Sequence, residues 1–335
     1  MTKPIQSPLQ TESEINNHIS AEQPIWEAAE LIYTVQEEEA GILLRTVLLS
    51  RLHMSRRLIT RLKKLEHAIT VNGTRTYSHK PLEAGDIVRI RIAEPQLDTI
   101  EPEPIAIDVL FEDDDILVVH KPAGIVVHPT KGYSSGTLAN GVVHYWRSRG
   151  EHTRFRPVHR LDQETSGVLV IAKHAFAHQQ LSEQMKRNQM VKRYIAFTEG
   201  VPQLARGTVN APIDRDPDEP HMRIVTPAGY DSITHYDVVN TYGTIAAKVE
   251  CELETGRTHQ IRVHMQHLGC PLIGDKFYNQ DSILSIPMTR HALHAAYLSF
   301  DHPMSGEKVV FTAPLPAELE QLEMTLSKRK ETSTQ

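Results

Sequence analysis

Cysteine is scarce in this sequence, because only Cys251 and Cys270 occur among its 335 residues. Two thiols cannot build a disulfide framework, and by themselves they cannot hold a structural zinc ion, so we expect both to be reduced and partly buried. No apolar run approaches the roughly 20 residues that a membrane span requires. The N-terminus also lacks the basic start and apolar stretch of a secretory signal. These absences predict a cytoplasmic protein with no membrane partner.

Charge is distributed unevenly along the chain, although the net charge is only −6. Residues 1–40 contain eight glutamates and one basic residue, Lys3. This composition, with few large apolar groups before Trp26, predicts a mostly disordered acidic tail over residues 1–30. Residues 41–93 instead contain eleven Lys and Arg against three acidic residues. Such an excess suits binding to a polyanion.

The basic block predicts a small α/β domain over residues 31–95. Its first part, GILLRTVLLSRLHMSRRLITRLKKL, places apolar residues at three- and four-residue steps, which predicts two short amphipathic helices broken near His53–Met54. Ser55 is the expected N-cap of the second helix. The second part, HAITVNGTRTYSHKPLEAGDIVRIRI, alternates around an Asn72–Gly73 turn and predicts a small β segment.

The order of these elements, with SRR, VNG and GD in place, resembles the RNA-binding domain named after small-subunit ribosomal protein S-four. A solvated charged face is the simpler alternative for a basic helix. The turn chemistry and the charge excess favour RNA binding. The expected RNA-binding residues are Arg45, Arg56, Arg57, Arg61, Lys63, Lys64 and Asn72.

A domain boundary is expected near residue 100. The stretch EPQLDTIEPEPIAID holds three prolines, acidic residues and little apolar periodicity, which predicts an extended linker over residues 96–106. A catalytic domain is expected over residues 107–320. Residues 321–335 are expected to form a polar tail, and its last residues, KRKETSTQ, are expected to be disordered.

Short β-branched strands alternate with a few helices in the larger domain. Strands are expected at DILVVHKP, VLVIAK, KRYIAFTEG, IAAKVECEL, AAYLSF and KVVFTA, and helices at about 137–147, 175–188 and 259–268. Several strands are joined by turns too short for a crossover, such as HPMSGE. This pattern favours an α+β domain with a central, largely antiparallel or mixed sheet.

The segment PVHRLDQETSGVLVIAK, residues 157–173, changes abruptly from charged to apolar residues. A charged HRLD precedes a TSG turn and then the fully apolar strand Val168 to Ala172. Asp162 would therefore lie in a loop at a sheet edge, held by a rigid scaffold as functional residues often are. An aspartate in a turn is more commonly only a turn residue.

A second segment, CELETGRTHQIRVHMQHLG, is expected to be a strand, a turn and a helix capped by Thr258. Arg262 lies beside the inner stripe of that helix, where a guanidinium can reach a partly buried carboxylate and stabilise its ionised form. An ordinary structural salt bridge is the alternative. In the third segment, KRYIAF, Tyr194 lies opposite Ile195 and Phe197, on what we expect to be the polar face, where its ring could stack on a base or simply pack.

Together, HRLDQETSG, KRY and TGRTHQIRVH resemble, in order and spacing, the RluA-type family of RNA pseudouridine synthases. DDDILVVHKPAGIVVHP is similar to that family's opening motif, and GDKFY at residues 274–278 also fits. The resemblance covers about residues 108–315. It implies the pseudouridine synthase fold and an isomerase that detaches uracil from ribose, turns it, and re-attaches it through carbon.

The resemblance also implies residue roles and partners. Asp162 is the catalytic aspartate, Arg262 its partner, and Tyr194 the ring that stacks on the base, while Arg160 helps to hold the RNA after base flipping. The implied substrate-binding residues are His159, Arg160, Leu161, Thr165, Arg257, Gln260 and Ile261. Ribosomal RNA or transfer RNA is the implied partner, no cofactor is needed, and a monomer is expected.

Three alternatives stay open at this level. Nineteen histidines raise the question of a metal, but His259, His264 and His267 match no helical metal-binding pair, so no metal site is expected. A non-catalytic RNA-binding or ribosome-assembly factor would explain the basic domain but not the Asp, Tyr and Arg set. A glycosidase or nucleoside hydrolase generally needs two catalytic carboxylates, whereas Asp162 is the only acidic residue of these motifs that is expected to act in catalysis.

Overall fold

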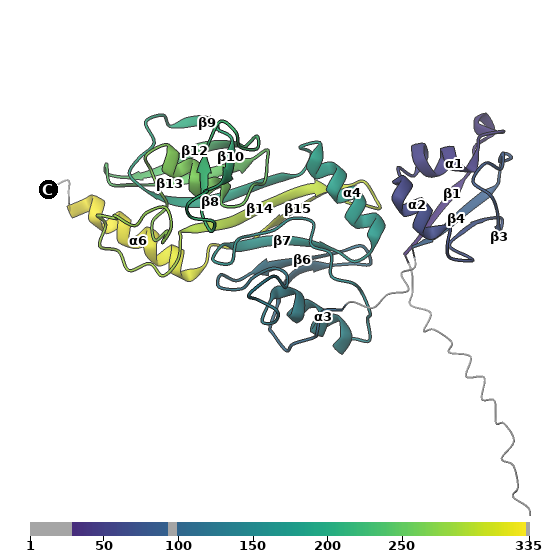
Figure 1. Ribbon diagram of the computed structural model, residues 1–335, viewed down its shortest axis with the longest axis horizontal. Helices are drawn as coiled ribbons and strands as arrows, with labels where there is room; N and C mark the ends of the chain where they lie inside the picture. Colours follow the sequence, from purple (N-terminus) through teal and green to yellow (C-terminus); the bar gives the residue numbers. More distant parts are fainter. Residues whose placement is uncertain (1–28, 93–98, 333–335) are drawn as a thin grey trace, which may run out of the picture.

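A mixed nine-stranded sheet forms the body of the larger domain in the computed structural model, which describes residues 29–92 and 99–332 (Figure 1). Its spatial order is β5-β6-β7-β14-β8-β13-β12-β9, with β15 also paired to β14. Only β7 and β14 pair in parallel, and the other neighbours are antiparallel. The strands are β5 (Asp108–Glu112), β6 (Ile116–Lys121), β7 (Ser166–Ala172), β8 (Val191–Glu199), β9 (Arg206–Asn210), β12 (Ile233–Tyr242), β13 (Ala246–Leu253), β14 (Leu293–Asp301) and β15 (Lys308–Thr312). The expected α+β class and largely antiparallel sheet are confirmed.

Helices cover both faces of this sheet. The helices are α3 (Leu138–Ser148), α4 (Ala175–Lys186), α5 (Gln260–His267) and α6 (Ala317–Thr332), and a small ribbon joins β10 (Ile213–Arg215) to β11 (Arg223–Val225). Side chains of α3 and α5 share one apolar cluster with alternate residues of β7 and β8, while α4 and α6 pack on the opposite face. Within the described residues, no helix is both long enough and apolar enough to cross a membrane.

The expectation of a polar tail over residues 321–335, disordered over KRKETSTQ, is wrong for residues 321–332. They continue α6, which begins at Ala317. Leu319, Leu322 and Leu326 follow one another at three- and four-residue steps and are buried against the sheet. This apolar stripe stabilises the helix despite its polar composition, because burial outweighs the polar character of the exposed face. Residues 333–335 lie outside the described part of the chain.

The N-terminal domain is a four-stranded antiparallel sheet, in the order β1-β4-β2-β3, with short helices against it (Figure 1). Its elements are β1 (Ala29–Thr34), the 3-10 turn η1 (Glu37–Glu39), α1 (Leu44–Thr46), the π-helical turn η2 (Val47–Arg51), α2 (Arg56–Leu62), β2 (Ile69–Val71), β3 (Thr74–Arg75) and β4 (Ile87–Ile92). Ser55 caps α2 by accepting a hydrogen bond from the Leu58 amide, as expected. Asn72 and Gly73 form the turn between β2 and β3, with φ angles of 51° and 78°.

The boundaries of this domain differ from the expected ones at both ends. β1 begins at Ala29, inside the range assigned to the acidic tail, because the apolar residues of AELIYT pair with β4. Residues 1–28 lie outside the described part of the chain, and so do residues 93–98 of the linker. Residues 99–107 form no helix or strand, yet they lie against α3: the Asn140 side chain donates to the Glu101 carbonyl, and Gly136 donates to Glu103.

The two domains meet at α4. Phe176, at the start of α4, is buried within the apolar cluster of the N-terminal domain. The Gln179 side chain accepts a hydrogen bond from the Ser55 amide at 2.7 Å and donates one to the His53 carbonyl at 2.7 Å. The C-terminal end of the same helix carries Met185, which lines the pocket described next. One helix therefore contacts the basic domain at one end and the pocket at the other.

Candidate active site

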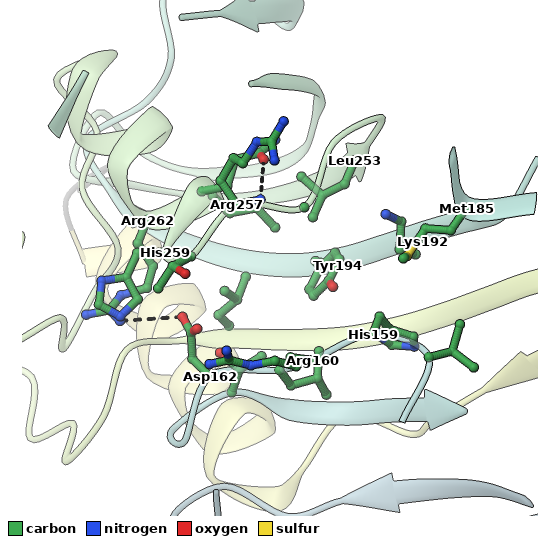
Figure 2. A pocket seen from close by; sticks show the side chains of 18 residues that line it. His159, Arg160, Asp162, Met185, Lys192, Tyr194, Leu253, Arg257, His259 and Arg262 are labelled. Atoms are coloured by element: carbon green, nitrogen blue, oxygen red, sulfur yellow. Dashed lines mark hydrogen bonds and ion pairs between the residues drawn. The ribbon is translucent and has the colours of Figure 1, made fainter. Parts of the chain in front are cut away.

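A pocket of about 310 Å³ lies on the face of the sheet covered by α3 and α5 (Figure 2). All three expected catalytic residues and all seven expected substrate-binding residues line it. Its lining comprises Val158, His159, Arg160, Leu161, Asp162, Thr165, Met185, Lys192, Tyr194, Leu253, Gly256, Arg257, Thr258, His259, Gln260, Ile261, Arg262 and Leu293. The HRLD, KRY and TGRTHQIR motifs, which are far apart in the sequence, thus meet at one site.

Asp162 lies in the loop that leads into β7. The Thr165 amide donates to the Asp162 carbonyl at 3.0 Å and closes a tight turn. β6 and β14 flank β7, so the loop that carries Asp162 lies at the end of an interior strand. Two buried cations hold this turn: Lys121 donates to the Gln163 carbonyl at 2.9 Å, and Arg290 donates to the Glu164 carbonyl at 2.9 Å.

Close packing at the start of β7 fixes where this loop can lie. Gly167 has a φ of 125°, and a Cβ there would lie 2.2 Å from the carbonyl oxygen of Ala295 on β14. Only glycine fits such an approach of two backbones. The parallel pairing of β7 and β14 therefore depends on the TSG sequence that follows Asp162.

Arg262 projects from α5 and contacts two carboxylates. Its Nη1 lies 3.5 Å from Asp162 Oδ2, while Nε and Nη2 donate to Asp275 at 2.7 and 2.9 Å in a bidentate pair. The Asp162 side chain is 24% exposed, whereas that of Asp275 is completely buried. The expected contact between Arg262 and Asp162 is present, but Asp275 is the closer partner and was not predicted. Its signal was GDKFY, a motif that the sequence showed without a role.

Aromatic rings complete the surroundings of this guanidinium. The Arg262 Cζ lies 5.3 Å from the Phe277 ring centroid and 5.0 Å from that of Tyr278. The Tyr278 hydroxyl accepts from the Arg223 amide and hydrogen-bonds Nδ1 of His259, which lines the pocket. Burial first of all lowers the pKa of His259, to about 4, so this ring is neutral near pH 7. The pocket therefore holds Arg262 rigidly and presents Asp162 as its exposed carboxylate.

Tyr194 projects from β8 into the centre of the pocket (Figure 2). The prediction that it lies on a polar face is wrong: the alternation separates it from Ile195 and Phe197 as expected, but its side of the strand is covered by the apolar cluster of α3 and α5. Tyr194 as a whole is 6% exposed. Burial, and secondarily the charge of Asp162, raise the pKa of Tyr194, so its phenol stays protonated. The ring offers a neutral aromatic surface next to the carboxylate.

The other expected substrate-binding residues differ in whether their side chains are free to contact a substrate. Arg160 and Arg257 are exposed at the rim, and Leu161 and Ile261 supply apolar wall. Gln260 is buried, and both ends of its side-chain amide are hydrogen-bonded. Its Oε1 accepts from the Thr255 hydroxyl and the Arg257 amide, and its Nε2 donates to the Ile233 carbonyl and the Thr234 hydroxyl. Gln260 thus fastens the start of α5.

Thr165 and His159 form part of the pocket in different ways. The hydroxyl of Thr165 is hydrogen-bonded to Nε2 of His291 at 2.8 Å, beneath the turn that carries Asp162. Both ring nitrogens of His159 are buried without a hydrogen-bond partner. Thr165 therefore supports the loop, whereas His159 retains its full capacity to bind a ligand.

The expected RNA-binding residues lie on the N-terminal domain, away from this pocket. Leu58, Ile59 and Leu62 form the buried stripe of α2, which leaves the basic residues of that helix exposed as predicted. Asn72 is a turn residue whose side chain donates to Asp86 and accepts from the Ile87 amide. The exposed basic residues are Arg45, Arg56, Arg57, Arg61, Lys63 and Lys64. Their role in binding RNA stays a prediction.

One group in the described part of the chain has metal-ligand geometry, with atoms of Asp113, Asp115 and His302 within 4.8 Å of one another. His302 Nδ1 accepts from the Ser305 amide, so its Nε2 carries the proton and donates to Asp113 at 2.9 Å. A protonated nitrogen cannot bind a metal, and we assign this group a structural role.

The sequence matches the family described as RNA pseudouridylate synthase over residues 115–267, a span that includes Asp162 and Arg262. An uncharacterized RNA pseudouridine synthase of Bacillus subtilis, YlyB, is 41% identical over 263 residues, which cover 78% of this chain and 86% of the relative. This chain belongs to the RNA pseudouridylate synthase family. The present chain, called the synthase below, is also 39% identical to ribosomal large subunit pseudouridine synthase D of Xanthomonas campestris over 254 residues. These residues cover 72% of the present chain and 76% of the relative.

The fold of the synthase agrees with this assignment. The solved structure of human RNA Pseudouridylate Synthase Domain Containing 1 is 27% identical, with a TM-score of 0.52, and covers 67% of the synthase and 97% of the human chain. The synthase is thus an isomerase of the RNA pseudouridine synthase class, as the motifs indicated. The hydrolase and non-catalytic alternatives are left without support.

Proposed function

We propose that the synthase isomerises specific uridines of large-subunit ribosomal RNA, with Asp162 as the catalytic carboxylate. The observation that carries this proposal is the meeting of Asp162, Arg262 and Tyr194 in one pocket, 3.5 Å separating the first two. Relatives named ribosomal large subunit pseudouridine synthase D, from Xanthomonas campestris and Buchnera aphidicola, support the choice of ribosomal RNA. Transfer RNA is the alternative substrate.

In this proposal each residue has a separate task. The uracil leaves the helix and lies against Tyr194, whose neutral ring supports it while the bond to ribose is broken and remade. Asp162 reacts in its ionised form, and Arg262 stabilises that charge while Asp275 keeps the guanidinium in place. Arg160 and Arg257 at the rim contact the RNA backbone. The reaction breaks the bond between ribose C1′ and uracil N1 and forms a bond between C1′ and C5 of the same base. Carbon 5 releases one proton and N1 takes up one, so nothing is consumed overall.

We propose that the N-terminal domain, similar to the S-four type, supplies a sequence-independent contact to RNA through its exposed basic residues. A second pocket in this domain, of about 660 Å³, includes Lys63 and Arg75 beside Tyr77, a tyrosine that is 77% exposed. An exposed ring among cations suits a single-stranded nucleic acid. We further propose that the synthase acts as a monomer and in the cytoplasm.

A purified-enzyme assay tests the proposal. Ribosomal RNA and transfer RNA labelled with tritium at uridine carbon 5 release the label when that carbon bonds to ribose. We expect release from ribosomal RNA by the wild type and a loss of at least about a thousandfold in Asp162→Asn. Glu164→Gln, in the same turn but outside the pocket lining, should keep its activity. Release by Asp162→Asn at the rate of the wild type would refute the assignment of Asp162.

A further inference from the structure

Lys192 is a buried cation without a partner. It lies on β8, two residues before Tyr194 and on the same face, and is 6% exposed. Three other Lys or Arg residues of the described chain are equally buried, namely Lys121, Arg262 and Arg290. Each of these binds carbonyls or carboxylates. Within residues 29–92 and 99–332, the Lys192 ammonium has neither, and burial alone lowers its pKa.

His159 lies near this ammonium with two unsatisfied nitrogens. Both Nδ1 and Nε2 are buried and make no hydrogen bond. Burial, and next the charge of Lys192, lower the pKa of His159 to about 3, so the ring is neutral and offers one N–H donor. A buried cation and a buried unsatisfied donor each cost free energy in the unliganded fold. Such costs are common where a ligand completes the site.

The position of the pair suits one part of the substrate. Figure 2 shows Asp162 and Arg262 toward one end of the pocket, Lys192 and His159 toward the other, and Tyr194 between them. Two residues along a strand span about 6.7 Å, so the ammonium is rooted about that far from the aromatic platform. It extends to within 4.0 Å of where a side chain at Gly256 would begin. Within the described residues, no carboxylate pairs with the Lys192 ammonium at this end of the pocket.

An occupant of this end must carry negative charge and accept a further hydrogen bond. On an RNA substrate the groups with both properties are the backbone phosphates. We propose that Lys192 and His159 bind the phosphate next to the target uridine, and so fix the nucleotide with its base on Tyr194 and its ribose toward Asp162. This inference rests on the proposed function, since it takes RNA as the substrate. The pair acts by positioning and takes no part in bond making.

The test compares Lys192→Met with Lys308→Met, in which an exposed lysine paired with Asp301 is neutralised outside the pocket lining. The probe is large-subunit ribosomal RNA transcribed in vitro. We expect KM for Lys192→Met to rise about ten- to a hundredfold, the loss of one charged hydrogen bond, while kcat changes less than about threefold. The dependence of log affinity on log salt should become shallower by about 0.7, corresponding to one phosphate contact on single-stranded RNA.

Folding supplies a second readout. Replacing the unpaired ammonium of this largely buried side chain by an apolar side chain of similar length should leave the melting temperature equal or higher. His159→Phe should raise KM without changing the salt dependence, because the lost donor is neutral. A lower melting temperature together with an unchanged salt dependence in Lys192→Met would show a structural lysine and overturn the inference, as would unchanged affinity.

The failure of this inference is distinguishable from failure of the proposed function. If the wild type releases no tritium but Lys192→Met still weakens RNA binding with a shallower salt dependence, the proposed function fails and the phosphate site stands. If the wild type is active and Lys192→Met matches Lys308→Met in KM and salt dependence, the phosphate site fails and the proposed function stands.

Discussion

Replacing Asp275 by Asn tests whether this residue holds the catalytic arginine. The substitution keeps the size of the side chain, and one oxygen can still accept from the amides of Phe277 and Tyr278. It removes the negative charge that Arg262 contacts at 2.7 and 2.9 Å. The guanidinium, 5% exposed, is left with Asp162 at 3.5 Å as its only carboxylate in the described chain.

The expected cost follows from burial. Removing one partner of a buried ion pair destabilises a protein by about 3–5 kcal/mol, because a charge stays buried without compensation. Asp162 and the two rings beside Arg262 retain part of the compensation, so we expect about 3 kcal/mol for Asp275→Asn. We also expect kcat to fall about tenfold to a hundredfold, since an arginine that shifts toward Asp162 no longer leaves it correctly placed.

The predicted effect of Asp275→Asn on stability should also depend on pH. Burial raises the pKa of Asp275, but the hydrogen bonds and charge of Arg262 outweigh it and hold the pKa below the ordinary value. A carboxyl with a depressed folded-state pKa stabilises the fold above its unfolded pKa of about 3.9, and this contribution is lost as the pH falls through the folded value. The difference in stability between wild type and Asp275→Asn should therefore shrink below about pH 4.

Urea denaturation of both proteins at several pH values measures these quantities. The matched control is Asp237→Asn, which breaks an exposed ion pair with Arg206 and should cost less than about 1 kcal/mol. A loss in Asp275→Asn no larger than in the control would refute the reasoning that the buried pair holds Arg262. A difference that stays constant down to pH 2 would refute the assignment of the ionised carboxylate.

Two further substitutions, each with a control, test the scaffold by urea denaturation. Gly167→Ala should lower the free energy of unfolding by about 2–4 kcal/mol, because its Cβ would clash with the β14 backbone. Gly306→Ala, with φ 71° and open space around it, should lower it by about 1 kcal/mol, and equal losses would contradict the close approach. Leu322→Ala should lower it by about 2–5 kcal/mol if α6 is packed as described. Met324→Ala, at a residue that is 51% exposed on the same helix, should lower it by less than about 0.5 kcal/mol, and equally small losses would contradict the packing of α6.

The sequence predicted the composition of the pocket better than its geometry. Motifs with unusual residue combinations identified all ten expected pocket residues, because such combinations arise where chemistry constrains several positions at once. The same reasoning did not assign Asp275, since nothing in GDKFY shows that its carboxylate folds back onto an arginine on α5. Lys192 was missed for a related reason: whether a lysine has a partner depends on burial in three dimensions.

Local pattern also misled where the tertiary context decides. Tyr194 was placed on a polar face because it lies opposite Ile195 and Phe197, but α3 and α5 cover that side of β8. The last helix was not predicted because its composition is mostly polar. Its three apolar leucines stabilise the helix only because the sheet is there to bury them. Strands β9 and β12 pair with each other although residues 211–232 lie between them in the sequence, and their polar residues gave little signal of it.

The central claim is that the synthase makes pseudouridine through Asp162, and mapping pseudouridine across total RNA tests it most directly. Cells lacking the gene are complemented with wild type or Asp162→Asn, and modified sites are read by an adduct that stops reverse transcription. We expect specific sites in large-subunit ribosomal RNA to vanish on deletion and to return only with the wild type. Return of those sites with Asp162→Asn, or no change on deletion while the protein is expressed, would contradict the account.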